Sequence, residues 1–132
     1  MTAEFRALCH SLGLSAQSVA AIAQVPQRTV RYWFASGEPP AEVLTVIQRL
    51  DGALDLQVLR ALDFVDEIGR EQGAKPETIS LRAYQTEQEW WQAHPEYEGL
   101  PIQTHGVQLR RVQQALQKQG IKCMISYGGE KD

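Results

Sequence analysis

Residues 14–37 read LSAQSVAAIAQVPQRTVRYWFASG and carry the clearest structural pattern in the chain. The pattern predicts a first helix that begins after Ser15, a residue type favoured at the N-cap, and runs to Gln24. Pro26 then favours the start of a second helix, because its missing N–H costs nothing there and its φ is already helical. We expect this second helix to cover residues 27–35. Two short helices joined by a tight turn are therefore predicted near the start of the chain.

The inward faces of the two helices follow from the spacing of their small and apolar residues. Val19, Ala20 and Ala23 are expected on one side of the first helix. Ala20 is expected at the helix contact, because two steeply crossed helices need a small side chain where they touch. Val30 and Trp33 lie three positions apart, so both should face the first helix and the core.

The remaining side chains of the second helix form a polar and basic surface. Arginine reads guanine through two parallel hydrogen bonds, glutamine reads adenine in the same way, and threonine can contact a thymine methyl group. Gln17, near the start of the first helix, is placed to bind a phosphate together with the N-terminal N–H groups of that helix. The candidate DNA-binding residues are Gln17, Gln27, Arg28, Thr29, Arg31 and Tyr32.

This arrangement resembles the Cro/C1-type (XRE-like) helix-turn-helix family. The matching residues are Gln17, Val19, Ala20, Ala23, Val25, Thr29, Val30, Trp33, Gly37 and the Pro39-Pro40 pair. The chain departs from the family at the turn, where Gln24 replaces the usual glycine, and after Trp33, where the link to Gly37 is longer. The resemblance implies a DNA-binding head whose second helix enters the major groove.

The net charge of the chain is −3 at pH 7, which by itself disfavours DNA binding. Residues 1–40, however, carry three arginines against two glutamates, whereas residues 41–73 carry three arginines against seven acidic residues. Residues 74–132 carry seven basic and seven acidic residues. Because DNA affinity depends on the local field at the interface, the acidic middle segment does not exclude DNA binding. The modest charge of the first segment indicates that one subunit binds weakly, so dimerisation should matter.

The first two segments are predicted to be entirely helical. A helix over residues 3–12 should have Thr2 as its N-cap and Gly13 as its C-cap. A long helix is predicted over residues 41–72, with a point of division at Asp51-Gly52. An internal core is the favoured role for its apolar stripe, and a dimer contact is the alternative. The stripe consists of Val43, Leu44, Ile47, Leu50, Leu54, Val58, Leu62, Val65 and Ile68.

The last segment, residues 74–132, has a different sequence pattern from the helical segments before it. It is predicted to have the order β-α-α-β. The predicted elements are a linker at 73–77, a strand at 79–85, a helix at 86–93, a loop at 95–101, a helix at 107–119 and a strand at 121–127. Two strands are marginal alone, so we expect a homodimer that pairs strands or helices across a two-fold axis. The expected fold is mostly α with a small α+β C-terminal part. Its predicted divisions are a helix-turn-helix core (1–40), a connecting helix (41–73) and a dimerisation domain (74–132).

The whole arrangement also resembles the small anti-CRISPR-associated repressors of phages and mobile elements. The matching residues are Arg28, Tyr32-Trp33, Ser36-Gly37, Leu81-Arg82-Ala83-Tyr84 and Glu89-Trp90 through His94-Pro95. The resemblance implies that the C-terminal half dimerises and that the protein represses its own operon.

Other sequence patterns offer little support for an enzyme, a cofactor or a metal. Cys9 and Cys123 are interpreted as two reduced thiols, and the three histidines as surface or packing residues. No phosphate-binding loop or nucleophile elbow is present. Arg110-Arg111 is interpreted as a solvated pair, with nucleic-acid contact as the alternative. Since no apolar run approaches the roughly 20 residues of a membrane span and no signal-peptide pattern is present, a cytoplasmic protein is expected.

The sequence therefore predicts a dimeric transcriptional regulator, most simply an autorepressor, that binds an inverted-repeat (palindromic) operator in double-stranded DNA. Two alternatives stay open. One is an antitoxin-like protein that binds a protein partner and regulates itself by binding DNA. The other is an RNA-binding module, although no stacking aromatic residues on a sheet face support it.

Overall fold

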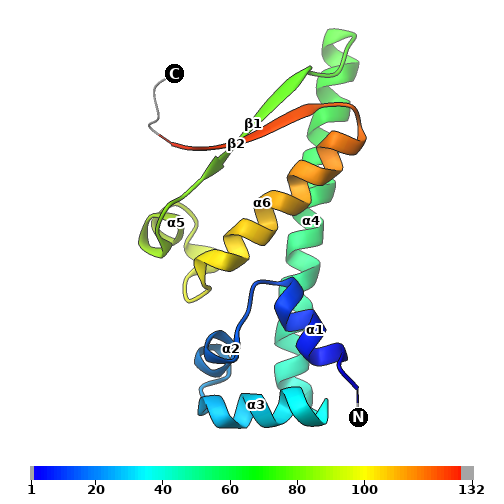
Figure 1. Ribbon diagram of the computed structural model, residues 1–132. Helices are drawn as coiled ribbons and strands as arrows, with labels where there is room; N and C mark the ends of the chain where they lie inside the picture. Colours follow the sequence, from blue (N-terminus) through cyan, green and yellow to red (C-terminus); the bar gives the residue numbers. More distant parts are fainter. Residues whose placement is uncertain (1, 129–132) are drawn as a thin grey trace.

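The computed structural model describes residues 2–128 and is mostly helical, with two short parallel strands near the C-terminus (Figure 1). This confirms the predicted mostly-α fold with a small β part. The elements are α1 (Glu4–Ser11), α2 (Ala16–Ala23), α3 (Gln27–Ser36), α4 (Ala41–Gln72), β1 (Thr78–Ala83), α5 (Glu87–Ala93), the 3-10 helix η1 (Pro95–Tyr97), α6 (Ile102–Lys118) and β2 (Lys122–Tyr127). Within residues 2–128, no helix has both the length and the hydrophobicity needed to cross a membrane.

Helices α1, α2 and α3 pack with the first half of α4 around one hydrophobic core. The predicted inward residues Val19, Ala20, Val30 and Trp33 are all buried, whereas Ala23 is half-buried. The buried members of this core are Phe5, Cys9, Leu12, Leu14, Val19, Ala20, Val30, Trp33, Ile47 and Leu54.

Both predicted caps of the first helix and the predicted position of Pro26 are wrong. The N-cap of α1 is Ala3 and no side chain caps the helix, because the backbone of Thr2 instead lies against Gly37 at the end of α3. The C-cap is Leu12, and Gly13 follows it with a φ of +73°. Pro26 is the N-cap of α3 rather than its first helical residue, because its ψ of 151° is extended.

The turn between α2 and α3 is short and well closed by hydrogen bonds. The Ser15 hydroxyl accepts a hydrogen bond from the Ser18 N–H at 3.2 Å, which confirms Ser15 as the N-cap of α2. Gln24 ends α2 in the left-handed conformation, with φ 59° and ψ 47°. The Val25 N–H donates to the Ala20 carbonyl at 3.1 Å. Gln24 therefore takes the backbone conformation for which glycine is usually required.

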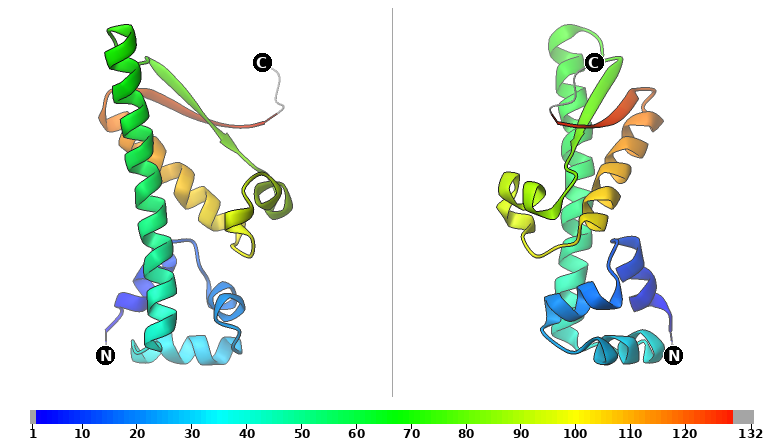
Figure 2. Two further views of the ribbon diagram at one scale, coloured as in Figure 1. Left: turned by 180° about the vertical axis from the view of Figure 1, so that it is seen from behind. Right: turned by 60° about the vertical axis from the view of Figure 1, so that its left-hand side comes forward.

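Helix α4 runs unbroken through Asp51-Gly52, so the predicted division is wrong (Figures 1 and 2). Leu54 packs in the first core just after this point, and Arg111 of α6 holds Asp51 at 3.0 Å. These contacts stabilise the helix on both sides of Gly52. All nine residues of the predicted apolar stripe are buried or half-buried, which confirms its role as internal core.

The C-terminal part has the predicted β-α-α-β order, with the short helix η1 added. Strands β1 and β2 pair in parallel, with Thr78 opposite Lys122 and Ala83 opposite Tyr127. The second hydrophobic cluster joins α4, α6 and the sheet; its buried members are Val65, Val112, Leu116, Ile121 and Cys123. Helix α6 begins at Ile102 rather than at residue 107, because Thr104 and His105 are held by tertiary contacts that make the first turn of the helix part of the interior.

Candidate nucleic-acid interface

Helix α3 lies at one end of the molecule, across the start of α4, and its outer side is not covered by any other element (Figures 1 and 2). Val30 and Trp33 turn toward the core, with 0% and 7% of their surface exposed. Arg28, Arg31 and Tyr32 are exposed on the outer side, and Tyr32 retains 69% of its surface. The core contacts of α3 therefore direct two cations and one aromatic ring toward solvent.

Gln27 and Thr29 border this outer side rather than lying on it. Both are half-buried, and at about 100° per residue they fall on opposite flanks of the stripe that contains Arg28 and Arg31. Arg31 Nη2 donates a hydrogen bond to Gln27 Oε1 at 2.8 Å. The exposed surface of α3 thus presents an arginine that is already oriented by its neighbour one turn earlier.

Gln17 lies in a different setting from the other candidates. It is exposed at the start of α2, beside a cleft that Trp91 and Gln103 also line. Among the hydrogen bonds of residues 2–128, none joins Gln17 to a residue of α3. The structure brings Gln27 and Arg31 together but does not bring Gln17 to them.

The local charge of the α3 surface is positive. The helix carries two arginines and no acidic residue, and the next acidic residues along the chain are Glu38 and Glu42. The outer side of α3 itself therefore carries only positive side-chain charges, whereas the whole chain has a net charge of −3.

The two arginines at 110 and 111 have different surroundings, so the interpretation as one solvated pair is wrong for Arg111. Arg111 Nη1 lies 3.0 Å from both Asp51 and Asp55 of α4, because α6 packs along α4 at this level. Arg110 is exposed and donates to Gln113 Oε1 at 2.6 Å.

Both cysteines are buried free thiols. Burial raises the pKa of Cys9 to about 11, so this thiol stays protonated and unreactive at neutral pH. Within the described part of the chain, no three His, Cys, Asp or Glu side chains are placed to hold a metal ion.

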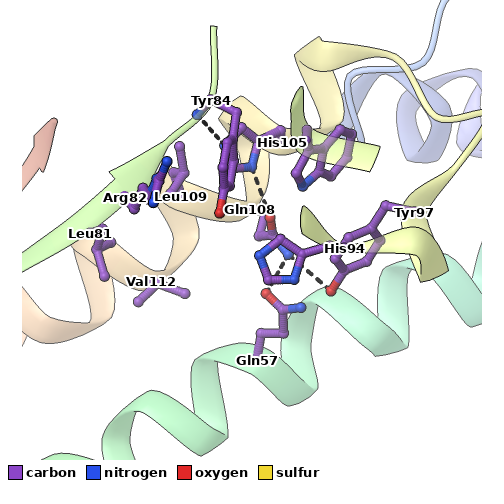
Figure 3. Close-up of a pocket in the computed structure, with 11 residues that line it drawn as sticks. Gln57, Leu81, Arg82, Tyr84, His94, Tyr97, His105, Gln108, Leu109 and Val112 are labelled. Atoms are coloured by element: carbon purple, nitrogen blue, oxygen red, sulfur yellow. Dashed lines mark hydrogen bonds between the residues drawn. The ribbon is translucent and has the colours of Figure 1, made fainter. Parts of the chain in front are cut away.

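Sequence reasoning missed a polar network in which His105 is the central residue (Figure 3). His105 is buried, and its Nε2 accepts the Tyr84 N–H at 3.1 Å. Nε2 therefore carries no proton, so Nδ1 donates to Gln108 Oε1 at 3.1 Å. Gln108 Nε2 in turn donates to the Tyr97 hydroxyl at 3.1 Å and to Gln57 Oε1. Burial lowers the pKa of His105 below its ordinary value, with the Gln108 hydrogen bond acting against this and His94 adding to it.

Aromatic rings surround this network and line a half-open cavity. Trp90 stacks on Tyr97, with centroids 5.1 Å apart, and on His105 at 4.9 Å. Tyr84 lies 5.6 Å from His105. The cavity, of about 210 Å³, lies where α4, β1, α5, η1 and α6 meet (Figure 3). The richness of residues 84–108 in tryptophan, tyrosine and histidine was the available sequence signal, but it does not reveal which rings meet.

Comparison of the sequence with protein-family models gives no match, and comparison with curated proteins gives no significant match.

Proposed function

We propose that this protein is a sequence-specific DNA-binding transcriptional regulator, a dimeric autorepressor of the Cro/C1-like helix-turn-helix type. In this proposal α2 and α3 form the helix-turn-helix unit, and α3 enters the major groove. The observation that carries the proposal is the uncovered outer side of α3, where Arg28, Arg31 and Tyr32 are exposed while Val30 and Trp33 hold the helix on its core.

The chemistry of this surface suits base recognition. A guanidinium can donate two parallel hydrogen bonds to guanine in the major groove. Arg28 is the second residue of α3. The N-terminal part of a recognition helix is the part that contacts base edges. The absence of acidic residues from α3 removes the main source of repulsion from phosphates.

Replacing Arg28 tests the proposal directly. Arg28→Ala should weaken binding to the inverted repeat upstream of the gene by about two to four orders of magnitude, because a symmetric dimer loses a contact of roughly 1–3 kcal/mol in each half-site. Arg28 is exposed, so the melting temperature should not change. Fluorescence anisotropy with labelled DNA measures the affinity.

The control is Arg110→Ala, which removes an equally exposed arginine from α6. Binding should then stay at the parental level. If Arg28→Ala binds as tightly as the parent while Arg110→Ala does not, the DNA-binding surface lies on α6 and the proposal is wrong. Tighter binding of the parent to RNA than to the DNA duplex would favour the RNA-binding alternative.

A dimer that reads one inverted repeat must present both α3 helices on the same side. Since α3 lies at the end of α4, the two α3 helices face the same way when the two-fold axis runs roughly along α4 (Figure 1). Leu56, Leu59 and Phe64 of α4 have 44%, 58% and 57% of their surface exposed. At about 100° per residue, Leu56 and Leu59 lie opposite the buried stripe and Phe64 lies on its flank. The exposed charged residues of this side are Arg60, Asp63 and Glu67. Helices α5 and α6 and the sheet all lie on the other side (Figure 2). We assign this exposed side of α4 to a second copy of the chain.

The length of α4 supports this assignment. Its 32 residues give a length of about 48 Å at 1.5 Å per residue, long enough for an extended helix pair. Exposed large apolar side chains such as those of Leu56 and Leu59 are a common feature of such contacts. An antitoxin-like protein would use the same surface for a different partner, so copurification of another protein at a 1:1 ratio would favour that alternative.

A further inference from the structure

The Phe34 ring joins α3 to α1. Phe34 is half-buried, and the centre of its ring lies 5.7 Å from that of the buried Phe5 of α1. The Cζ atom of Arg6 lies 5.9 Å from the centre of the Phe34 ring, and the His10 ring packs edge-on against it, with the centres 5.8 Å apart. Arg6 and His10 are one turn apart on α1, and both are exposed. The contact therefore places two exposed nitrogen-bearing side chains of α1 beside α3.

Phe34 lies on one flank of the exposed side of α3. At about 100° per residue, the middle of this side lies between Arg28 and Ala35. Arg31 lies between that middle and Phe34, which is about 60° further around the helix. Since Arg6 covers the Phe34 ring, the positive surface of α3 continues past Arg31 onto α1.

The Arg6 guanidinium is available to bind an anion. Arg6 takes part in no ion pair within residues 2–128, in contrast to Arg111, which is paired with two aspartates. Glu4, the acidic residue of α1, lies about 160° from Arg6 around the helix, where it lines a cleft together with Pro39 and Gln48. The aromatic ring beneath the guanidinium limits its orientations without neutralising its charge.

The dimensions of DNA set this flank against the phosphates when α3 occupies the major groove. The major groove of B-DNA is about 12 Å wide, and a helix with its side chains is about 10–12 Å across. Such a helix turns the middle of its outer side to the base edges and its flanks to the two phosphate strands. Because Arg6 lies beyond the flank of α3, its guanidinium then faces the backbone of one strand rather than the bases.

We infer that Arg6 binds a DNA backbone phosphate at the edge of each half-site, oriented by the Phe34 ring and with His10 beside it as a second donor. The inference rests on the proposed function, because it requires α3 in the major groove. Phosphate contacts set the position of a protein on the duplex without reading its sequence. Arg6 should therefore contribute to the binding of operator and unrelated DNA alike, whereas Arg28 should contribute mainly to operator binding.

Binding of the full chain to two DNA duplexes at several salt concentrations tests the inference. One duplex carries the inverted repeat, and the other has the same length and composition with scrambled half-sites. Arg6→Gln should weaken binding to both duplexes by a similar factor, at least about fivefold at about 100 mM salt. The slope of log K against log salt concentration should become shallower by about 2, because one phosphate contact is lost in each half-site. Fluorescence anisotropy measures both quantities.

Two further variants control for charge and for position. Arg6→Lys retains the charge and should keep the parental slope, because a lysine also neutralises a phosphate. Arg70→Gln removes an exposed arginine near the end of α4 that lies away from α3, and it should change neither affinity nor slope (Figure 1). Since Arg6 and Arg70 are both exposed, all three variants should keep the parental melting temperature.

The outcomes distinguish this inference from the proposed function. If the parent prefers the inverted repeat and Arg6→Gln keeps the parental slope, or weakens binding to the inverted repeat alone, the inference is overturned while the proposed function stands. If the parent binds the two duplexes equally, or binds neither, the proposed function fails and this inference fails with it.

Discussion

Gly13 and Thr104 hold the end of α1 against the start of α6. The Thr104 hydroxyl donates to the Leu12 carbonyl at 2.7 Å, and both residues are buried. Gly13 follows with a φ of +73°, and a Cβ atom at this position would lie 2.7 Å from the Gln103 carbonyl carbon. The backbone at Gly13 therefore lies so close to the backbone at Gln103 that position 13 has no room for a side chain.

Gly13→Ala should consequently reduce the free energy of unfolding by about 2–4 kcal/mol, because both the left-handed φ and the backbone contact become unfavourable. Gly73→Ala is the matched control: its φ of +79° is similar, but no atom lies within 4 Å of the Cβ position. That variant should lose only about 1–2 kcal/mol. Urea unfolding followed by circular dichroism measures both, and equal losses would contradict the tight contact at Gly13.

His105 makes stability depend on pH. Burial lowers the pKa of His105 below 6.5, its ordinary value, so the unfolded chain binds a proton more readily than the folded chain. The free energy of unfolding should thus be highest above pH 6.5 and should fall as the pH drops below it. His105→Asn should flatten this dependence, although its stability at neutral pH will be lower because the network is broken. The measurement is the melting temperature of the parent and of the variant between about pH 7.5 and pH 5.5. If both melting temperatures fall equally as the pH drops, His105 is not the source of the pH dependence.

At the scale of elements, α2 and α3 pack in one hydrophobic core that includes the small residue Ala20. Ala20 retains 7% of its surface, and its carbonyl accepts the Val25 N–H in the turn that leads to α3. Local patterns were enough to locate this pair, since the cap at Ser15, Pro26 and the spacing of Val30 and Trp33 all act within a few residues. The first turn of α6 was not located in this way, because the hydrogen bonds of Thr104 and His105 reach residues far away in the sequence.

Enlarging Ala20 tests the α2–α3 contact. Ala20→Leu should destabilise the protein by about 1–3 kcal/mol, because the extra atoms must force two close helices apart. Ala21→Leu adds the same atoms at the next position, which is exposed, and should change stability by less than about 0.5 kcal/mol. Thermal melts distinguish the two. A parental melting temperature for Ala20→Leu would mean that the helices do not touch there.

At the scale of the whole molecule, α4 is shared by both hydrophobic cores. Its first half packs with α1, α2 and α3, and its second half packs with α6 and the sheet. Arg111 adds a polar link between α6 and α4 through Asp51 and Asp55. Because both cores use the same side of α4, the opposite side is left with exposed apolar residues.

Leu56→Lys should therefore weaken the proposed homodimer at least about tenfold, since it replaces one of the exposed leucines of α4 with a charge one turn from Leu59. Met124→Lys is the control: Met124 on β2 has 46% of its surface exposed, close to the 44% of Leu56, but lies on the sheet. Sedimentation equilibrium gives the dissociation constant. A monomeric parent would refute the dimer, whereas a dimer weakened only by Met124→Lys would move the contact to the sheet.

The helices and strands of this protein were largely predictable from the sequence, since caps, turn residues and apolar periodicity act over a few neighbouring residues. The tertiary structure alone decided that α4 stays continuous at Gly52, that Arg111 pairs with α4 and that the rings of Tyr84, Trp90, Tyr97 and His105 come into contact. It also determined which apolar residues of α4 stay exposed. Each of these features depends on contacts between segments far apart in the chain, and such contacts form only when the elements pack against one another.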